Sequence, residues 1–147
     1  MKSKLIASAA GDGRRTFAVI MDTGDEFTRC MTRFANEQKL TAAQFTAIGA
    51  FSSAVLGYFE WERKDYRRIL IDEQVEVVSL LGDVAIKDGK SSLHPHITLA
   101  KRDGSAWGGH LLEGIVRPTL EIIVSEAPAS LARRHDPQTG LALIKLD

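Results

Sequence analysis

Residues 16–37 read TFAVIMDTGDEFTRCMTRFANE, a stretch that decides the fold because it predicts a strand followed directly by a helix. Apolar and polar residues alternate sufficiently over Thr16–Asp22 to predict a strand with one buried face. Thr23-Gly-Asp-Glu26 then has the spacing of a capping box, in which Thr23 accepts a backbone hydrogen bond and Glu26 reaches back. The sequence therefore predicts that a helix begins at this point.

The predicted helix carries one apolar stripe. Its apolar residues recur at the i, i+3, i+4, i+7 spacing, and they are Phe27, Cys30, Met31 and Phe34. Charged residues fall elsewhere on the helix, so the stripe is expected to pack on a sheet. Cys30 is the only cysteine of the chain, and its place in the stripe favours a buried small hydrophobe over a reactive thiol.

The rest of the chain is strand-like, with many β-branched residues and short turns. The expected strands are Gln44–Ala50, Ser53–Glu60, Tyr66–Ile71, Val75–Leu81, Val84–Lys87, Leu93–Ala100, Gly108–Val116, Thr119–Ser125 and Leu141–Leu146. We expect a turn near Gly49 and hairpin turns at Asp88-Gly89 and Asp103-Gly104. One early amphipathic helix packed on a mostly antiparallel sheet gives an α+β fold class.

The overall composition limits the functions that the chain can have. With 147 residues, 44% of them hydrophobic and 26% charged, we expect a single globular domain over residues 1–147. Lys+Arg and Asp+Glu both total 19, so the net charge is zero. No sequence-wide basic excess is available to neutralise a phosphate backbone. DNA binding, if present, must use a local patch or a partner and is expected to be weak.

The apolar runs are short. The longest, such as Phe17–Met21 and Ile122–Val124, end well before the ~20 residues that a membrane span needs. The first residues, MKSKLIASAAGDGRR, lack the apolar stretch of about 7–15 residues found in a secretory signal. We therefore expect no membrane partner and a cytoplasmic location.

Three of the four histidines of the chain lie in two short segments, Leu93-His-Pro-His-Ile97 and Trp107-Gly-Gly-His-Leu111. Residues two apart in a strand face the same side, with Cα atoms about 6.6 Å apart, so His94 and His96 can converge on one point. The turn at Asp103-Gly104 would bring His110 beside this pair. Three imidazoles and an open position are typical of a divalent metal site, for which zinc is the expected ion, although nickel, copper or iron accepts the same ligands.

A second interpretation is that these residues are half-buried strand histidines hydrogen-bonded to the backbone. His135 lies among turn residues and is expected to be a solvated loop residue. Glu113, three residues after His110, points to the opposite face of a regular strand and is a poor fourth ligand. We expect no other carboxylate to be placed as a partner of the three histidines.

Two weaker patterns concern nucleic acids. The basic doublets Arg14-Arg15, Arg63-Lys64, Arg67-Arg68 and Arg133-Arg134 could join into a phosphate-facing patch, but most such doublets are solvated. Tyr58, Phe59, Trp61 and Tyr66 alternate with charges as in a stacking platform, although strand aromatics are usually core or interface residues.

Several segments, taken in order, resemble the PPC (plants and prokaryotes conserved) domain. They are Thr23-Gly-Asp-Glu26, Thr46-Ala-Ile-Gly-Ala50, Glu76-Val-Val-Ser-Leu-Leu-Gly82, Leu93-His-Pro-His-Ile-Thr-Leu99, Gly108-Gly-His-Leu-Leu-Glu-Gly114 and Thr119-Leu-Glu-Ile-Ile123. The resemblance covers residues 15–127. It implies an α+β domain that assembles as a homotrimer and is commonly assigned a proposed DNA-binding role.

This chain departs from the plant members of that family. It lacks the Arg-Gly-Arg-Pro AT-hook that inserts into the minor groove. It also has Gln74-Val-Glu-Val-Val-Ser79 in place of the plant segment Gly-Arg-Phe-Glu-Ile-Leu. The resemblance thus implies fold and oligomer more strongly than function.

Three hypotheses remain open. The chain is a homotrimer with a divalent metal at His94, His96 and His110 that binds or transforms a small molecule, or it is a DNA-binding regulatory module. The third is a structural interaction domain whose histidines only stiffen the sheet. In an enzyme, metal-bound water would serve as nucleophile or base in hydrolytic or lyase chemistry, but the sequence assigns neither a reaction nor a catalytic residue.

Overall fold

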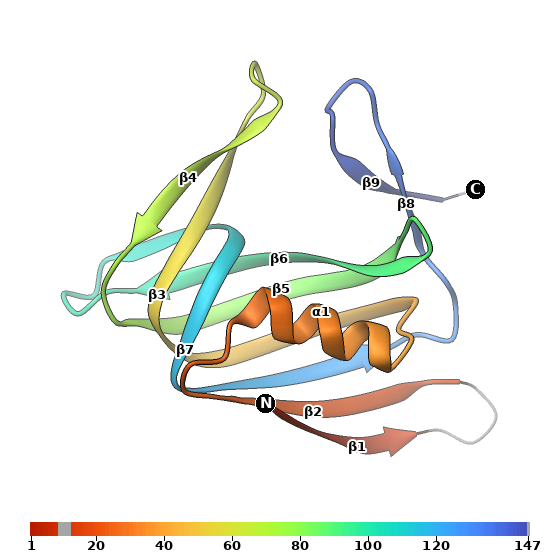
Figure 1. Cartoon of the computed structure of the whole chain (residues 1–147), viewed down its shortest axis with the longest axis horizontal. Coiled ribbons are helices and arrows are strands. Elements are labelled where there is room, and N and C mark those ends of the chain that lie inside the picture. Colours follow the sequence, from red (N-terminus) through yellow and green to blue (C-terminus); the bar gives the residue numbers. More distant parts are fainter. Residues whose placement is uncertain (9–12, 147) are drawn as a thin grey trace.

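A computed structural model describes residues 1–8 and 13–146, and in these residues one helix covers part of a large, mostly antiparallel sheet (Figure 1). Residues 9–12 of the N-terminal segment lie outside the described part. The elements in chain order are β1 (Lys2–Ser8), β2 (Arg15–Asp22), α1 (Phe27–Glu37), β3 (Ala42–Glu60), β4 (Asp65–Ile71), β5 (Val75–Lys87), β6 (Lys90–Ala100), β7 (Ala106–Glu126), β8 (Ala132–His135) and β9 (Ala142–Lys145). The predicted α+β fold class is confirmed.

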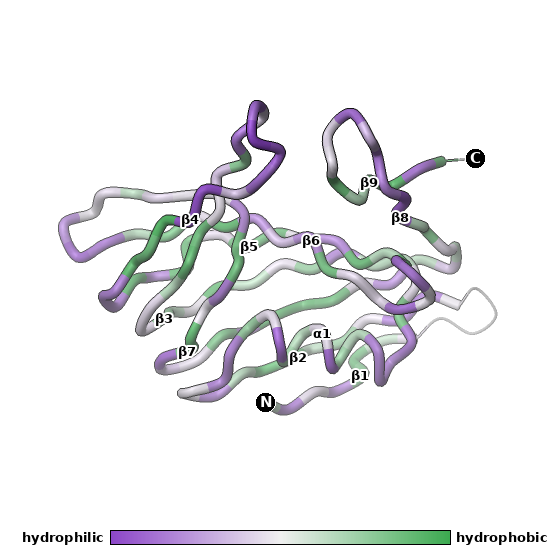
Figure 2. Tube along the Cα trace, turned by 45° about the horizontal axis from the view of Figure 1, so that its top comes forward, coloured by the Kyte–Doolittle hydropathy of each residue, from purple (hydrophilic) through white to green (hydrophobic). Residues whose placement is uncertain are grey.

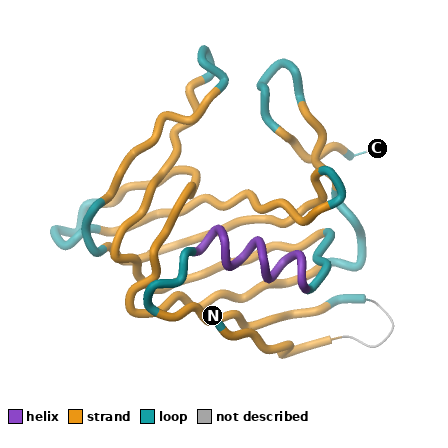
Figure 3. The backbone as a smooth tube through the Cα atoms, viewed as in Figure 1, coloured by secondary structure: helices purple, strands orange, loops and turns teal. Residues whose placement is uncertain are grey.

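The helix buries the predicted stripe. Phe27, Cys30, Met31 and Phe34 are all buried, and Ala35 is buried with them. The ring of Phe34 meets that of Phe17 on β2 edge-on at 5.4 Å, and Phe27 lies 6.0 Å from Phe45 on β3. Figure 3 shows the helix lying over strands of the sheet. Among the described residues, no helix has the length and apolar character needed to cross a bilayer.

The predicted start of the helix is wrong by three residues. Glu26, not Thr23, is the N-cap, and its carboxylate accepts hydrogen bonds from the backbone N–H groups of Thr28 and Arg29 at 2.9 and 2.6 Å. Thr23 instead donates its hydroxyl to the carbonyl of Pro118. The N–H of Gly24 also donates to β7, at 2.9 Å from the Val116 oxygen. These contacts hold residues 23–24 against the sheet, so the helix begins only after them.

The turn expected near Gly49 is also wrong, because β3 runs unbroken through it for 19 residues. At Gly49 the register shifts and φ is +147°, and a Cβ there would lie 2.3 Å from the carbonyl oxygen of Thr119. A bulge with a close backbone approach therefore replaces a turn. Two further pairs of predicted strands are merged in the same way, into β5 and β7.

β7 stays continuous because the register of its pairing with β3 shifts between Val116 and Leu120, where the sequence predicted two separate strands. Gly49 of β3 pairs with Leu120, but Phe51 pairs with Val116, so residues 117–119 bulge out of the ladder. Pro118, which has no N–H to offer, lies inside this bulge. The strand can therefore pass a proline without losing its partners.

Four strands form a closed circuit of antiparallel pairings. β3 pairs with β5, β5 with β6, β6 with β7, and β7 with β3. β4 extends the second half of β3, while β2 and then β1 extend the sheet from the second half of β7. The circuit requires the first half of β7 to lie between β3 and β6, and this placement positions His110.

β1 and β8 have no predicted counterpart. β8 and β9 form a short hairpin that is joined to β5 by the Ile86–Ala132 pairing and by the 2.8 Å hydrogen bond from the Ile86 N–H to the Leu131 carbonyl. The tip of this hairpin and the β3–β4 tip are hydrophilic and rise from the same side of the sheet (Figures 1 and 2). A four-residue strand such as β8, which contains two arginines, is too short and too polar to show a hydrophobic period.

The sheet face opposite the helix carries a continuous row of paired residues. Directly paired residues share a face, and the row runs Ala18, Ile123, Thr46, Leu81, His96 and His110. Phe45 packs under the helix, so its neighbour Thr46 faces the other side. The helix-free face therefore bears both exposed apolar residues and two histidines.

Replacing the helix N-cap tests this description. Glu26→Ala removes the acceptor of two helix N–H groups and of the Gly114 N–H on β7, and we expect the free energy of unfolding to fall by about 1 kcal/mol, measured by urea denaturation. Glu37→Ala, at the exposed end of the same helix, is the control and should change stability by less than about 0.5 kcal/mol. Equal effects of the two substitutions would contradict the N-cap assignment.

Candidate metal centre

The structure brings the three predicted histidines together. His94 and His96 extend from the same face of β6, with buried Pro95 on the other, and His96 pairs directly with His110 of β7. One ligand atom from each imidazole can be chosen so that all three lie within 4.8 Å of one another. The ring centroids are 5.0 to 5.5 Å apart. The three imidazoles thus form one cluster that could hold a metal ion.

His110 is the most enclosed of the group. Tyr66 of β4 stacks on its ring at a centroid distance of 4.8 Å, and its buried Nδ1 has no hydrogen-bond partner within the described part of the chain. Gly57 of β3 pairs with His110, and a Cβ on Gly57 would lie 2.7 Å from the Tyr66 ring. The absence of a side chain at Gly57 therefore lets Tyr66 reach the position from which it covers His110.

The surroundings of His94 and His110 favour their uncharged forms. Burial, followed by the nearby His94, His96 and Arg133, lowers the pKa of His110 to about 4. The pKa of His94 is also lowered, first by burial and then by Arg133 and His96, against a smaller opposing effect of Asp83. Neutral imidazole is the form that binds metal. His94 and His110 are therefore uncharged at neutral pH, the form in which an imidazole can bind a metal.

A carboxylate lies beside the histidines, contrary to the expectation from the sequence. Asp83 of β5 pairs with His94, and its Oδ2 is 3.8 Å from the Nδ1 of that ring. Arg133 of β8 donates from Nη2 to the Oδ1 of Asp83. The sequence gives no local signal for either residue, because both reach the cluster through strand pairings between distant segments.

The other two candidates lie outside the cluster. Glu113 is exposed and forms an ion pair with Arg68 at 2.6 Å, in agreement with its exclusion as a ligand. His135 is exposed as predicted, but it is the last residue of β8 rather than part of a loop. Neither belongs to the group of three histidines.

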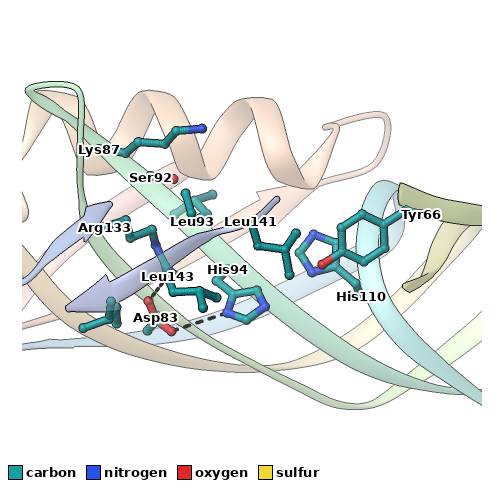
Figure 4. A pocket seen from close by; sticks show the side chains of 12 residues that line it. Tyr66, Asp83, Lys87, Ser92, Leu93, His94, His110, Arg133, Leu141 and Leu143 are labelled. Carbon is teal, nitrogen blue, oxygen red and sulfur yellow. Dashed lines mark hydrogen bonds and ion pairs between the residues drawn. The ribbon is translucent and has the colours of Figure 1, made fainter. Parts of the chain in front are cut away.

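A cleft of about 550 Å³ lies over two of the histidines. Figure 4 shows His94 and His110 on one side of it, with Asp83, Arg133 and the leucines of the C-terminal hairpin around them. Its lining residues are Tyr66, Asp83, Lys87, Ser92, Leu93, His94, His110, Arg133, Leu141, Ala142, Leu143 and Ile144. The volume is in the range of small-molecule sites.

The predicted basic doublets contain several arginines that are paired with carboxylates. Arg15 pairs with Glu126 at 2.5 Å, and Arg63 with Glu60 at 3.3 Å. Arg133 is buried against Asp83. The aromatic residues also divide, since Phe59 and Tyr66 pack edge to face at 5.4 Å while Tyr58 and Trp61 are exposed. The positive charge available to a phosphate backbone is therefore reduced by these ion pairs.

The fold and the cluster define a class of strand-rich α+β domains with three convergent histidines at a cleft. The sequence profile of the Plants and Prokaryotes Conserved (PCC) domain matches residues 8–128. The chain belongs to this family, which confirms the resemblance to the PPC domain drawn from its motifs. The proteins named bifunctional protein GlmU from two Synechococcus strains are 31% and 32% identical to it, and the chain spans about a fifth of their length.

Three solved structures are similar over nearly the whole chain. The plant- and prokaryote-conserved protein of Pyrococcus horikoshii is 30% identical with a TM-score of 0.86, over 95% of this chain and 98% of that one. A metal-containing protein of Archaeoglobus fulgidus is 33% identical with a TM-score of 0.83, over 99% of both chains. A Ralstonia eutropha protein with a proposed DNA-binding role is 28% identical with a TM-score of 0.83, over 95% of both.

The low pKa of His110 predicts a pH effect on stability in metal-free protein. Between about pH 6.5 and pH 4 the unfolded chain binds a proton at His110 that the folded chain does not. The free energy of unfolding should therefore decrease as the pH falls through this range. Urea denaturation at several pH values measures the slope, and His110→Asn should reduce it. A slope unchanged in this variant would refute the prediction.

Proposed function

We propose that the chain is a metal-binding domain that holds one divalent ion, zinc, through His94, His96 and His110, and that it binds a small molecule in the adjoining cleft. The observation that supports this most directly is the convergence of the three imidazoles within 4.8 Å. Donors bound about 2.0–2.1 Å from a tetrahedral zinc lie about 3.4 Å apart, so small rotations of the rings suffice. The metal-containing relative from Archaeoglobus fulgidus supports the same interpretation.

The donor set fits such an ion. The buried Nδ1 of His110 has no hydrogen-bond partner among the described residues, as expected for an atom that awaits a ligand. Asp83 Oδ2 lies 3.8 Å from the Nδ1 of His94, and a small rotation of the ring would let this carboxylate accept a hydrogen bond that orients the histidine. A bound divalent ion would supply Lewis acidity at an open position.

Assembly as a homotrimer is the second part of the proposal. The helix-free face has exposed apolar residues at Ile20, Ile48, Val78, Leu81 and Ile123. Several of them line a mostly apolar groove of about 400 Å³. A contiguous exposed apolar surface of this kind is typical of an interface, and a closed cyclic assembly would also protect sheet edges. This face therefore supports the association of three copies.

Metal analysis tests the first part. We expect about one zinc per chain in protein purified without a histidine tag, and His96→Ala should lose it because only two imidazoles remain. His135→Ala should retain it, because His135 lies outside the cluster. Elemental analysis gives the stoichiometry. Equal metal content in the parent and both variants would refute the assignment.

Sedimentation tests the assembly. The parent should have three times the 16.1 kDa mass of one chain at micromolar concentration. Ile48 is 61% exposed within the apolar face, and Ile48→Glu should yield monomers because a charge would be buried at the interface. Leu70→Glu places the same charge at an exposed leucine of β4, outside that groove, and should leave the mass unchanged. A monomeric parent would exclude the trimer.

Binding to DNA is the alternative, and the Ralstonia eutropha relative favours it. In this chain the zero net charge and the ion-paired arginines leave few counterions to be released. We expect a Kd no tighter than micromolar at ~150 mM salt, with little sequence preference, as measured by fluorescence anisotropy. A nanomolar, sequence-selective complex would favour DNA binding over the binding of a metal and a small molecule as the function of this chain.

A further inference from the structure

Arg133 of β8 has a buried hydrogen-bond donor that the protein does not use. The side chain of Arg133 is only 6% exposed, and it lines the cleft beside the histidines (Figure 4). Its Nη2 donates to Asp83, but its Nε is buried and has no hydrogen-bond partner among the described residues. A buried donor without an acceptor is unfavourable, since it has lost water and gained nothing. An acceptor from a ligand would satisfy it.

The charged side chains around the cleft indicate the sign of the charge on that ligand. Its lining contains two basic side chains, Lys87 and Arg133, and one carboxylate, Asp83. Apart from the histidines, the lining therefore has one more basic than acidic side chain. Lys87 is exposed, so its ammonium group can move toward a bound group. This excess of positive charge suits an anionic ligand, and a divalent ion held by the histidines would add to it.

The remaining wall of the cleft is apolar. β9 and the residue before it contribute Leu141, Leu143 and Ile144, and β6 contributes Leu93. This wall would bury a short hydrocarbon chain and exclude water from it. Arginine binds carboxylates through directed N–H donors, which a point charge does not provide.

We infer that the cleft binds a small monocarboxylate with a short apolar chain, its carboxylate held by Arg133 and Lys87 and its chain against β9. The inference deepens the proposed function and rests on it for the metal at the histidine end of the cleft. The residues that select the carboxylate belong in part to the C-terminal hairpin, which lies beyond residues 8–128 matched by the family profile. The hairpin therefore acts as the specificity element of the site.

Calorimetric titration of the full chain with defined acids tests this inference. Hexanoate should bind at one site per chain, and butanoate should bind about four- to sixteenfold more weakly, because each buried methylene contributes about two- to fourfold. Hexan-1-ol, which has the chain without the charge, and inorganic phosphate, which has charge without the chain, should both bind more weakly than hexanoate. Phosphate binding more tightly than hexanoate would overturn the choice of ligand.

Arg133→Met, which keeps an unbranched apolar stem but removes the guanidinium group and its charge, should weaken hexanoate binding by about tenfold or more. The matched control is Arg134→Met, because Arg134 is the exposed neighbour on β8 and does not line the cleft. The Arg134→Met variant should bind hexanoate with the same affinity as the parent protein. Lys87→Met should also weaken binding, and it provides the test if Arg133→Met does not fold.

Measuring metal content in the same samples separates the two proposals. Arg133→Met with parental metal content but weakened hexanoate binding supports the inference. Metal-loaded parent protein that shows no saturable hexanoate binding overturns the inference alone, as does unchanged affinity in a folded Arg133→Met variant. Parent protein that binds hexanoate but never binds metal would instead refute the proposed function and leave the anion site standing.

Discussion

The pairing of β6 with the first half of β7 is the constraint on which the rest of the structure depends. β7 is long enough to pair with β6 and β3 in its first half and with β3 and β2 in its second. The first half closes the circuit of strands and puts His110 beside His96, while the second half forms part of the sheet on which the helix packs. One strand thus contributes both to the histidine cluster and to the core. A change that shifted β7 by one residue would turn His110 away from its partners and its apolar residues away from the core.

Local patterns in the sequence predicted the helix stripe and most strand positions, because burial of one face of a helix or strand makes apolar residues recur at a regular spacing. These patterns failed where contacts between distant segments of the chain determine the local structure. Gly49 indicates a turn in isolation, but the close approach of Thr119 makes it a bulge within one strand. The helix start was misplaced because Thr23 and Gly24 are held by β7 rather than by the helix.

The three histidines could be selected from spacing and a turn signal, whereas their surroundings could not. Asp83 reaches His94 only through the register of β5 against β6, and Arg133 arrives on a short polar hairpin that has no recognisable period. Long-range strand pairing decides which carboxylate and which arginine join the cluster. The residue types themselves do not predict that pairing. The electrostatic character of the site is therefore a product of topology more than of any motif.

Gly57 shows how a residue without functional atoms can govern a site. The Tyr66 ring occupies the space that a side chain at this position would fill, and that ring covers His110. A single methyl group at Gly57 would push Tyr66 away and admit water to the most enclosed imidazole. In a survey of random substitutions, changes at position 57 would impair the site as changes of the histidines do, although Gly57 has no side chain that could donate or accept a hydrogen bond. Sensitivity to mutation at this position would thus report on the solvation of its neighbour.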